Sequence, residues 1–340
     1  MVQAVEGSGD YTLHHERIPA SAGPVAEPVE GADRIQTAIE CSKRAFPNGS
    51  DTVIIATAYD WPDALSAAPL SGTVMAPVLL VHQGYLDEPV EKEIERLGAS
   101  RAYIVGGHGA VSRDVGEKLW GMGLAVTRLA GTDRYGTSAA IAREIFERLE
   151  LNGKTDYEPT IACVVTGADY PDALAVGPLA AAGLWPVLLE PPAPGLWEGT
   201  SDLMEELGLT EALIIGGPGA VESWTEDELA AALGTDSVAR IAGPDRYWTA
   251  ALVAELGVVA GLTPDTVALA SGRDFPDALA GASLQRSSTS VLLLTDPGVV
   301  SEGTAAWLDL WGSGVFTIRF IGGSGAVSEA VRSRSLQLVR

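Results

Sequence analysis

Short apolar runs alternate with longer segments of helical periodicity along most of the chain. In the middle third, apolar side chains recur at helical spacing after Gly131, at Tyr135, Ala139, Ala142, Phe146 and Leu149. Thr132 is expected to cap this helix, with Asp133 in its first turn. Residues 160–166 are apolar and β-branched without alternation, which is typical of a strand covered on both faces. Strands alternating with helices indicate a parallel sheet between two helical layers.

The same order of segments occurs three times. Buried strands are expected at residues 52–57, 160–166 and 266–271, and further strands at 77–80, 186–189 and 290–293. In the middle copy, helices are expected at 171–182 and around 203–207, with strands at 212–215 and 238–241. Residues 25–29 are expected to form an edge strand, and residues 336–339 to supply the last strand of the third copy.

Three motifs recur in a fixed order and identify the copies as tandem repeats. The first is Gly-x-Asp-Arg, ending at Arg34, Arg134 and Arg246; the second is aromatic-Pro-Asp-Ala-Leu, with Trp61 and Asp63, Tyr170 and Asp172, or Phe275 and Asp277; the third is a diglycine beginning at Gly106, Gly216 and Gly322. The last two are separated by 43, 44 and 45 residues. This spacing predicts a leader or linker at residues 1–24 and Rossmann-like or flavodoxin-like α/β units at 25–127, 128–239 and 240–340.

Composition argues against some classes of function. The net charge of the 340-residue chain is −23, and only four residues are lysine. Nucleic acid is therefore an unsuitable partner, because no basic stripe exists to release its counterions. The acidity is consistent with either a salty habitat or simple solubility. No apolar stretch is long enough to span a membrane, and the N-terminus has no signal-peptide pattern. Cys41 and Cys163 are expected to be two separate buried thiols.

Each motif has a structural and a functional interpretation. The diglycine lies where a phosphate loop would, but the third glycine of the dinucleotide fingerprint is missing, so a tight turn is favoured. The Asp-aromatic-Pro-Asp loop follows a strand, where α/β sheets bind ligands; it either starts a helix capped by Asp172 or binds a cation or sugar through its carboxylates and ring. The repeated arginine either pairs with nearby acids or reaches a neighbouring unit or a polymer anion.

No catalytic constellation is repeated. The four histidines occupy positions without counterparts in the other units, and no nucleophile elbow or zinc-binding pattern is present. The chain is therefore expected not to be an enzyme.

The combined motifs resemble the cell wall binding repeat 2 family of Gram-positive surface proteins, over about residues 25–340. The resemblance implies three Rossmann-like modules packed as a pseudo-threefold trimer, which anchor a secreted protein non-covalently to anionic secondary polymers of the wall. It also implies an extracellular location at the cell wall or surface. A short Ile-Leu-Leu-type segment is implicated in anchoring in that family. Its counterparts here are Val78, Leu79 and Leu80; Val187, Leu188 and Leu189; and Val291, Leu292 and Leu293.

These segments also fit buried strands, which would make any anchoring role indirect. An anionic polymer approaching so acidic a chain needs a local arginine cluster or a bridging divalent cation. The arginine candidates are Arg34, Arg134 and Arg246; the cation or sugar candidates are Asp63, Asp172, Asp277, Trp61, Tyr170 and Phe275. No other cofactor is expected.

Unit one departs from the repeat in two places. Ile35 stands where the other units have tyrosine, and Gly31 lacks a preceding arginine like Arg128 or Arg240. Its copy of a repeated site is therefore expected to be degenerate.

The leading hypothesis is attachment to an anionic cell-wall polymer or surface glycan. The first alternative is a self-associating subunit of a surface layer or filament. The second alternative is an α/β enzyme or nucleotide-binding protein.

Overall fold

Three four-stranded parallel sheets form the framework of the computed structural model, which describes residues 23–153, 159–192 and 195–339. The expected leader lies almost wholly outside the described residues. The first sheet has the order β3 (Val78–Val81), β2 (Thr52–Thr57), β4 (Arg101–Val105), β5 (Ala125–Leu129). The second has the order β7 (Val187–Glu190), β6 (Ile161–Thr166), β8 (Glu211–Ile215), β9 (Val238–Ile241). The third has the order β11 (Ser290–Thr295), β10 (Thr263–Ser271), β12 (Thr317–Ile321), β1 (Val25–Val29).

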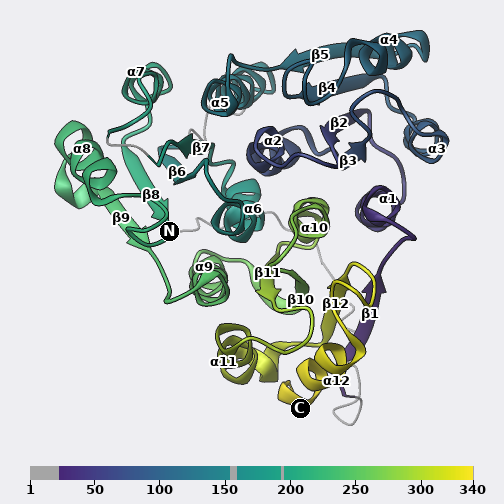
Figure 1. Cartoon of the computed structure of the whole chain (residues 1–340), viewed down its shortest axis with the longest axis vertical. Coiled ribbons are helices and arrows are strands. Elements are labelled where there is room, and N and C mark those ends of the chain that lie inside the picture. The colour runs from purple at the N-terminus through teal and green to yellow at the C-terminus, as the bar shows by residue number, and fades with distance from the viewer. Residues whose placement is uncertain (1–22, 154–158, 193–194, 340) are drawn as a thin grey trace, which may run out of the picture.

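Helices connect the strands and cover the sheets (Figure 1). Unit one contains α1 (Arg34–Ala45), η1 (Asp63–Ser66), α2 (Ala67–Val74), α3 (Glu88–Leu97) and α4 (Arg113–Gly121). Unit two contains α5 (Arg134–Leu151), α6 (Pro171–Gly183), α7 (Thr200–Glu206), α8 (Ser223–Leu233) and η2 (Thr235–Ser237). Unit three contains α9 (Arg246–Val259), α10 (Pro276–Ser287), α11 (Glu302–Trp311), η3 (Gly312–Gly314) and α12 (Glu329–Leu338). The α/β class and the three-unit arrangement are confirmed.

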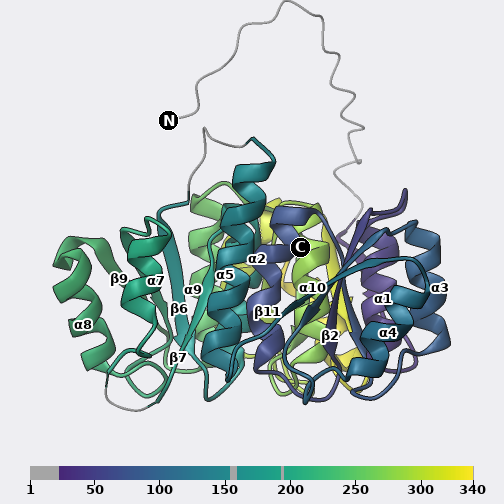
Figure 2. The same cartoon turned by 90° about the horizontal axis from the view of Figure 1, so that it is seen from above.

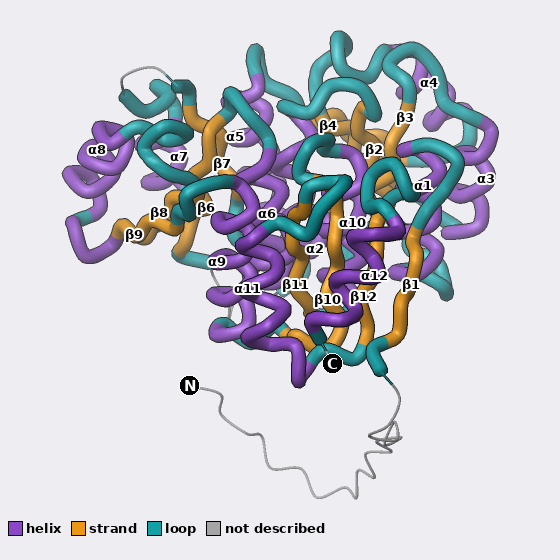
Figure 3. The backbone as a smooth tube through the Cα atoms, turned by 60° about the horizontal axis from the view of Figure 1, so that its bottom comes forward, coloured by secondary structure: helices purple, strands orange, loops and turns teal. Residues whose placement is uncertain are grey.

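The third sheet is completed by the N-terminal strand. Residues 25–29, which the repeat spacing groups with the first unit, pair in parallel with Thr317–Ile321 (Figure 3). Residues 336–339 do not form the expected last strand: Leu336 and Leu338 lie in α12. The place at the sheet edge is already taken by β1, and the final segment instead buries Val331 and Ser335 as one face of a helix.

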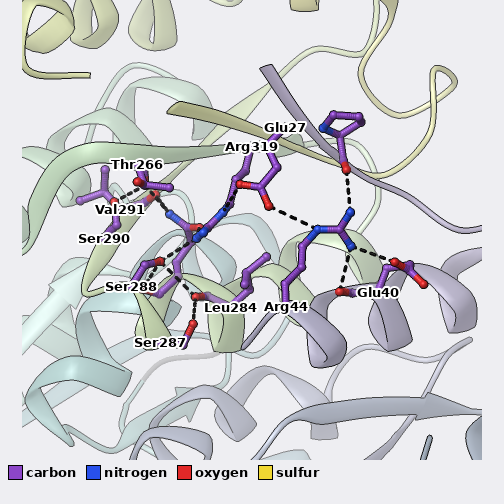
Figure 4. A network of polar contacts seen from close by, with 12 residues as sticks. Glu27, Glu40, Arg44, Thr266, Leu284, Ser287, Ser288, Ser290, Val291 and Arg319 are labelled. Atoms are coloured by element: carbon purple, nitrogen blue, oxygen red, sulfur yellow. Dashed lines mark hydrogen bonds and ion pairs between the residues drawn. The ribbon is translucent and has the colours of Figure 1, made fainter. Parts of the chain in front are cut away.

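Ion pairs hold β1 in place at both of its neighbours. The Glu27 carboxylate lies 2.9 Å from Arg319 Nε in β12 and 3.3 Å from Arg44 Nε in α1 (Figure 4). Arg44 also donates to the Pro28 carbonyl. The first strand is thereby connected to the sheet of unit three and to the first helix of unit one.

The three units meet along a central bundle of α2, α6 and α10 (Figure 1). Ala68, Ala181 and Ala282 form a small buried cluster between these helices. A Cβ atom added to Gly177 would lie 3.0 Å from the Ala282 side chain, so small residues are required for this close approach. Seen from above, helices α5, α2 and α10 run in roughly the same direction (Figure 2).

A second set of helices joins neighbouring units. Helix α1 packs on α10, α5 packs on α2, and α9 packs on α6. The Tyr103 hydroxyl in β4 donates to the Glu144 carboxylate in α5 at 2.6 Å. Burial and this carboxylate raise the pKa of Tyr103. Units two and three are therefore each fixed to the preceding unit, and unit one to unit three, through the first helix after the unit's own Gly-x-Asp-Arg motif.

Two expected helix caps are corrected. The N-cap of α5 is Asp133, whose side chain accepts from the Gly136 amide, and not Thr132. The N-cap of α6 is Tyr170, with Pro171 and Asp172 in the first turn, so Asp172 does not cap the helix. An aspartate caps by accepting from the amides two or three positions on, and Asp133 meets this geometry.

The described residues contain no helix that is both long and apolar enough to cross a membrane. Cys41 and Cys163 are buried and unpaired, as expected. Burial raises the pKa of the Cys163 thiol to about 12.

Candidate functional site

The three Asp-aromatic-Pro-Asp loops meet near the central axis, where β2, β6 and β10 end. The Trp61 and Tyr170 ring centroids are 5.9 Å apart, and those of Tyr170 and Phe275 are 6.2 Å apart. The carboxyl ends of parallel strands are where open α/β sheets place their ligands. The sequence predicted this position for each loop separately, and the fold brings the three loops together.

The repeated arginines lie around these rings. Arg134 stands over Trp61 at 5.1 Å and Arg246 over Tyr170 at 5.9 Å, each above the aromatic residue of the preceding unit. Arg34 instead stands over Tyr59 at 5.5 Å. A guanidinium over an aromatic face is attracted by the ring quadrupole. We use "axial ring" for the set Arg34, Arg134, Arg246, Trp61, Tyr170, Phe275, Asp60, Asp169 and Asp274.

Two of the three arginines pair with a neighbouring unit. Arg34 lies 3.0 Å from Asp274 of unit three, and Arg246 lies 3.3 Å from Asp169 of unit two. Arg134 differs, since no carboxylate of the described residues lies within 4.0 Å of its guanidinium nitrogens. It donates to the Gly167 carbonyl at the end of β6. The positive charge at Arg134 is therefore the one in the ring without a direct ion pair in the described structure.

The second aspartates of the three loops, Asp63, Asp172 and Asp277, which we call the inner aspartates, lie against the diglycine turns. Burial raises the pKa of Asp63, and Thr137 of the next unit and Gly107 of its own diglycine turn partly oppose this rise. A Cβ atom at Gly106 would lie 2.6 Å from Asp63 Oδ2, and the φ of Gly106 is +100°. Glycine is required here by the positive φ and by the aspartate that contacts it. The expectation that the diglycine forms a tight turn is confirmed.

The same joint occurs in the other units. Gly216 and Gly322 also have positive φ angles and contact Asp172 and Asp277. Burial, together with the neighbouring Asp169, raises the pKa of Asp172 to about 6. Burial, together with Asp274, likewise raises the pKa of Asp277 to about 6. Each of these aspartates therefore packs against the diglycine turn of its own unit.

The Val-Leu-Leu segments are interior. Their nine residues lie in β3, β7 and β11 and are at most 2% exposed. In this fold their side chains support the sheets, so a polymer outside the protein contacts other residues. An anchoring role for these segments stays a prediction, and it would act through folding.

The first aspartates of the three loops, Asp60, Asp169 and Asp274, complete the axial ring, and the sequence already placed them among the carboxylates of the repeated block. One feature was missed by sequence reasoning. The stacked side chains of Tyr59, His82 and Tyr85 are absent from the other units, so repetition gave no signal for them. Among the described residues, no group of three or more His, Cys, Asp or Glu side chains is arranged to hold a metal ion.

Comparison with known proteins assigns all three units to one family. The sequence model described as "Cell wall binding domain 2 (CWB2)" matches residues 29–116, 128–226 and 240–332. Among curated proteins, the N-acetylmuramoyl-L-alanine amidase LytC of Bacillus subtilis is 29% identical over 306 residues, covering 90% of this chain and 57% of the relative. The "Amidase enhancer" of the same species is 30% identical over 312 residues, covering 91% of this chain and 40% of the relative.

Two solved structures show the same arrangement. Cwp6 from Clostridium difficile has a TM-score of 0.82 at 26% identity, covering 94% of this chain and 48% of that one. Cwp8 from Clostridium difficile has a TM-score of 0.79 at 27% identity, covering 92% of this chain and 52% of that one. The chain thus spans about half the length of the proteins it matches.

Proposed function

The chain belongs to the cell wall binding domain 2 family, and from this premise we propose that it is a non-catalytic attachment module that binds an anionic cell-wall polymer non-covalently at the axial ring. The observation that carries the proposal is the gathering of three arginines and of the half-buried Trp61 and Tyr170 rings from separate units, where the central strands end. Phe275 was also expected to face a sugar, but it is only 4% exposed, so its ring packs in the core instead. Planar guanidinium groups suit phosphate and carboxylate oxygens, and aromatic faces suit sugar rings.

Arg134 is the residue we expect to bind the polymer anion first. Arg34 and Arg246 each already face an aspartate, whereas Arg134 has Trp61 beneath it and no ion pair with any residue that the structure describes. An anion at Arg34 or Arg246 would compete with these aspartates or need a divalent cation beside them. With a net charge of −23, the chain as a whole repels polyanions, which makes a cation bridge part of the proposal.

The relatives support a binding role rather than a catalytic one. One region of this chain matches both an amidase and an amidase enhancer, whose names give them different roles, and each relative is much longer than the match. The shared region is thus common to proteins that differ in activity. We propose a location at the cell surface, where such a polymer is found.

Sedimentation with isolated Gram-positive walls tests the proposal. The protein should bind intact walls and lose binding after the anionic polymers are chemically removed; binding that survives their removal would overturn it. Arg134→Gln should bind about tenfold more weakly, as expected for the loss of one charge-assisted contact. Arg113→Gln is the matched control, because Arg113 is an exposed arginine on α4 that pairs with Glu117 in its own helix.

A titration with EDTA and calcium, on the same walls, tests the cation bridge. Binding that increases with calcium and falls with EDTA supports bridging; binding independent of both leaves the arginines as the direct contacts. Self-association stays a separate prediction, to be measured by sedimentation velocity without polymer.

A further inference from the structure

Unit one carries a stack of three side chains that has no counterpart at the matching positions in the described parts of units two and three. The Tyr59 and His82 rings are 4.9 Å apart at 27°, and the His82 and Tyr85 rings are 4.4 Å apart at 15°. Arg34 of the axial ring lies over Tyr59 at 5.5 Å. The order Arg34, Tyr59, His82, Tyr85 therefore runs from the axial ring outward. We call the last three residues the aromatic shelf.

The aromatic shelf lies at the carboxyl edge of the first sheet. Tyr59 follows β2 and His82 follows β3 directly, so both stand where this fold places ligands. Tyr59 is 57% exposed and Tyr85 is 55% exposed. Large exposed side chains indicate a binding surface when they cluster at such an edge. Tyr85 is the outermost ring, since one of its faces meets His82 and the described residues place no ring or guanidinium against the other.

The loop that carries Tyr85 is fixed from several directions. The Ser112 amide donates to the Gln83 carbonyl at 2.7 Å, and the Gln83 side chain donates to the Gly109 carbonyl. Leu86 is buried beside it, and His82 lies 3.6 Å from Asp87. A ring held by a fixed loop loses little conformational freedom when a ligand stacks on it.

We propose that Tyr85 is a sugar-stacking platform, on which a pyranose ring of the polymer packs while a neighbouring anionic group is bound by the axial ring. The inference rests on the proposed function and names a subsite of it. Tyr59 and His82 act as positioning residues that hold Tyr85 in line with Arg34. A pyranose offers a face of weakly positive C–H groups, which fits the negative face of an aromatic ring.

The alternative explanation is that the stack only packs the loop. In that case the outer face of Tyr85 would add nothing to binding. The position of the stack argues for the sugar: it continues directly from an arginine of the axial ring, so a polymer lying along this edge would reach both.

Wall binding by three variants tests the platform. Tyr85→Ala should weaken binding about tenfold, whereas Tyr85→Phe should stay close to the parent because it keeps the ring and loses only the hydroxyl. Trp120→Ala is the matched control, since Trp120 is 74% exposed on α4 and lies outside the shelf. Equal binding by Tyr85→Ala and the parent would overturn the platform and leave the proposed function intact. A parent that fails to bind walls would overturn the proposed function itself.

Nuclear magnetic resonance of His82 gives an independent readout, because its ring protons lie under Tyr85. Addition of polymer released from walls by mild acid and then dephosphorylated should shift the His82 ring signals, which His82→Gln identifies. The neutral fragment should still act, because stacking needs no charge. A shift seen only with the charged fragment, or equal weakening by Tyr85→Phe and Tyr85→Ala, would contradict stacking.

Discussion

The diglycine turn of unit three is held by a different arginine from those of units one and two. In units one and two, an arginine on the last strand donates to the first diglycine carbonyl: Arg128 to Gly106 and Arg240 to Gly216, each at 2.7 Å. In unit three, Arg332 of helix α12 donates to Gly322 at 2.9 Å. The same bond is made from a helix instead of a strand.

The change follows from the N-terminal strand. Pro28 of β1 pairs with Phe320 of β12, the register position that Arg128 and Arg240 occupy in the other sheets. Proline is tolerated there because β1 is an edge strand. The helix position that provides Arg332 is Gly116 in unit one, which leaves room for Arg128. Arg332 of unit three thus takes the place of the arginine that is missing three positions before Gly31.

The N-terminal strand connects the last unit of the tandem chain back to the start of the first unit. Units one and two receive their fourth strand from their own sequence, whereas unit three receives it from residues almost 300 positions earlier. The two ends of the described chain therefore depend on each other. Unit three should be the one whose stability depends on the N-terminal segment.

The largest effect is expected from removing β1. Deletion of residues 1–29 removes the fully buried Val29 and one side of the β1–β12 ladder. Burial of one valine is worth about 2 kcal/mol, and each lost hydrogen bond about 1 kcal/mol, so we expect a loss on the order of 5 kcal/mol. Denaturant unfolding measures the loss, and hydrogen exchange should locate it in β12.

Deletion of residues 1–22 is the matched control, because it removes none of the described residues. It should leave unfolding unchanged. If removal of β1 left the exchange of β12 amides as slow as before, the closure would not depend on this strand.

The next effect concerns Arg332, which is 11% exposed. Arg332→Ala removes donors from the Gly322 and Val327 carbonyls and the ion pair with Glu30. We expect a loss of about 2 kcal/mol, measured by the same unfolding experiment, because buried carbonyls lose charged donors.

A compensating change sharpens this comparison. Pro28→Arg combined with Arg332→Gly recreates the strand-borne arrangement of unit one, and should recover part of the stability lost by Arg332→Gly alone. No recovery would mean that the helix-borne arginine does more than replace Arg128.

Much of the fold followed from the sequence because the chain repeats itself. The strands at residues 52–57 and 238–241 have the predicted bounds, because three copies of one pattern show where each element begins and ends. The expected strand at 336–339 was wrong for a non-local reason. Its apolar residues fit a strand or a helix, and the choice is made by β1, which no local pattern connects to β12.

The candidate site could likewise be predicted only in part from the sequence. The arginines and aromatic rings could be named because they are triplicated, but their meeting at the axis depends on how the units pack. The aromatic shelf occurs once, and its members come from two separate loops. A residue pattern without periodicity, formed only by folding, leaves no trace that sequence reasoning can follow.

The inner aspartates allow the repeated contact between aspartate and diglycine turn to be tested by changing the pH. The pKa values of Asp172 and Asp277 are raised to about 6 in the fold, against about 4 in an unfolded chain. Between pH 4 and 6 the folded state therefore holds more protons, so these groups make stability fall as pH rises through this window and add no change above it. The melting temperature should rise by a few degrees when the pH is lowered from 7 to 5.

The variant Asp172→Asn with Asp277→Asn should lose this part of the pH dependence and be more stable at pH 7. Asp114→Asn, on the exposed side of α4, controls for the general change in net charge. Some dependence of stability on pH should remain near pH 7, because burial raises the pKa of Glu190 to about 7. If the melting temperature of the double variant changed with pH as steeply as that of the parent, Asp172 and Asp277 would not titrate in this range.

The smallest effect is expected from the ion pairs that hold β1. Glu27→Gln weakens the contacts with Arg319 and Arg44, which are partly open to solvent, so we expect a loss of about 1 kcal/mol or less that shrinks as salt is added. Glu40→Gln is the matched control, because Glu40 pairs with the same Arg44 but does not belong to β1. If both variants lost equal stability and neither changed the exchange of β1 amides, the role of Glu27 would lie in neutralising Arg44, and the strand would be held by Val29 and the ladder alone.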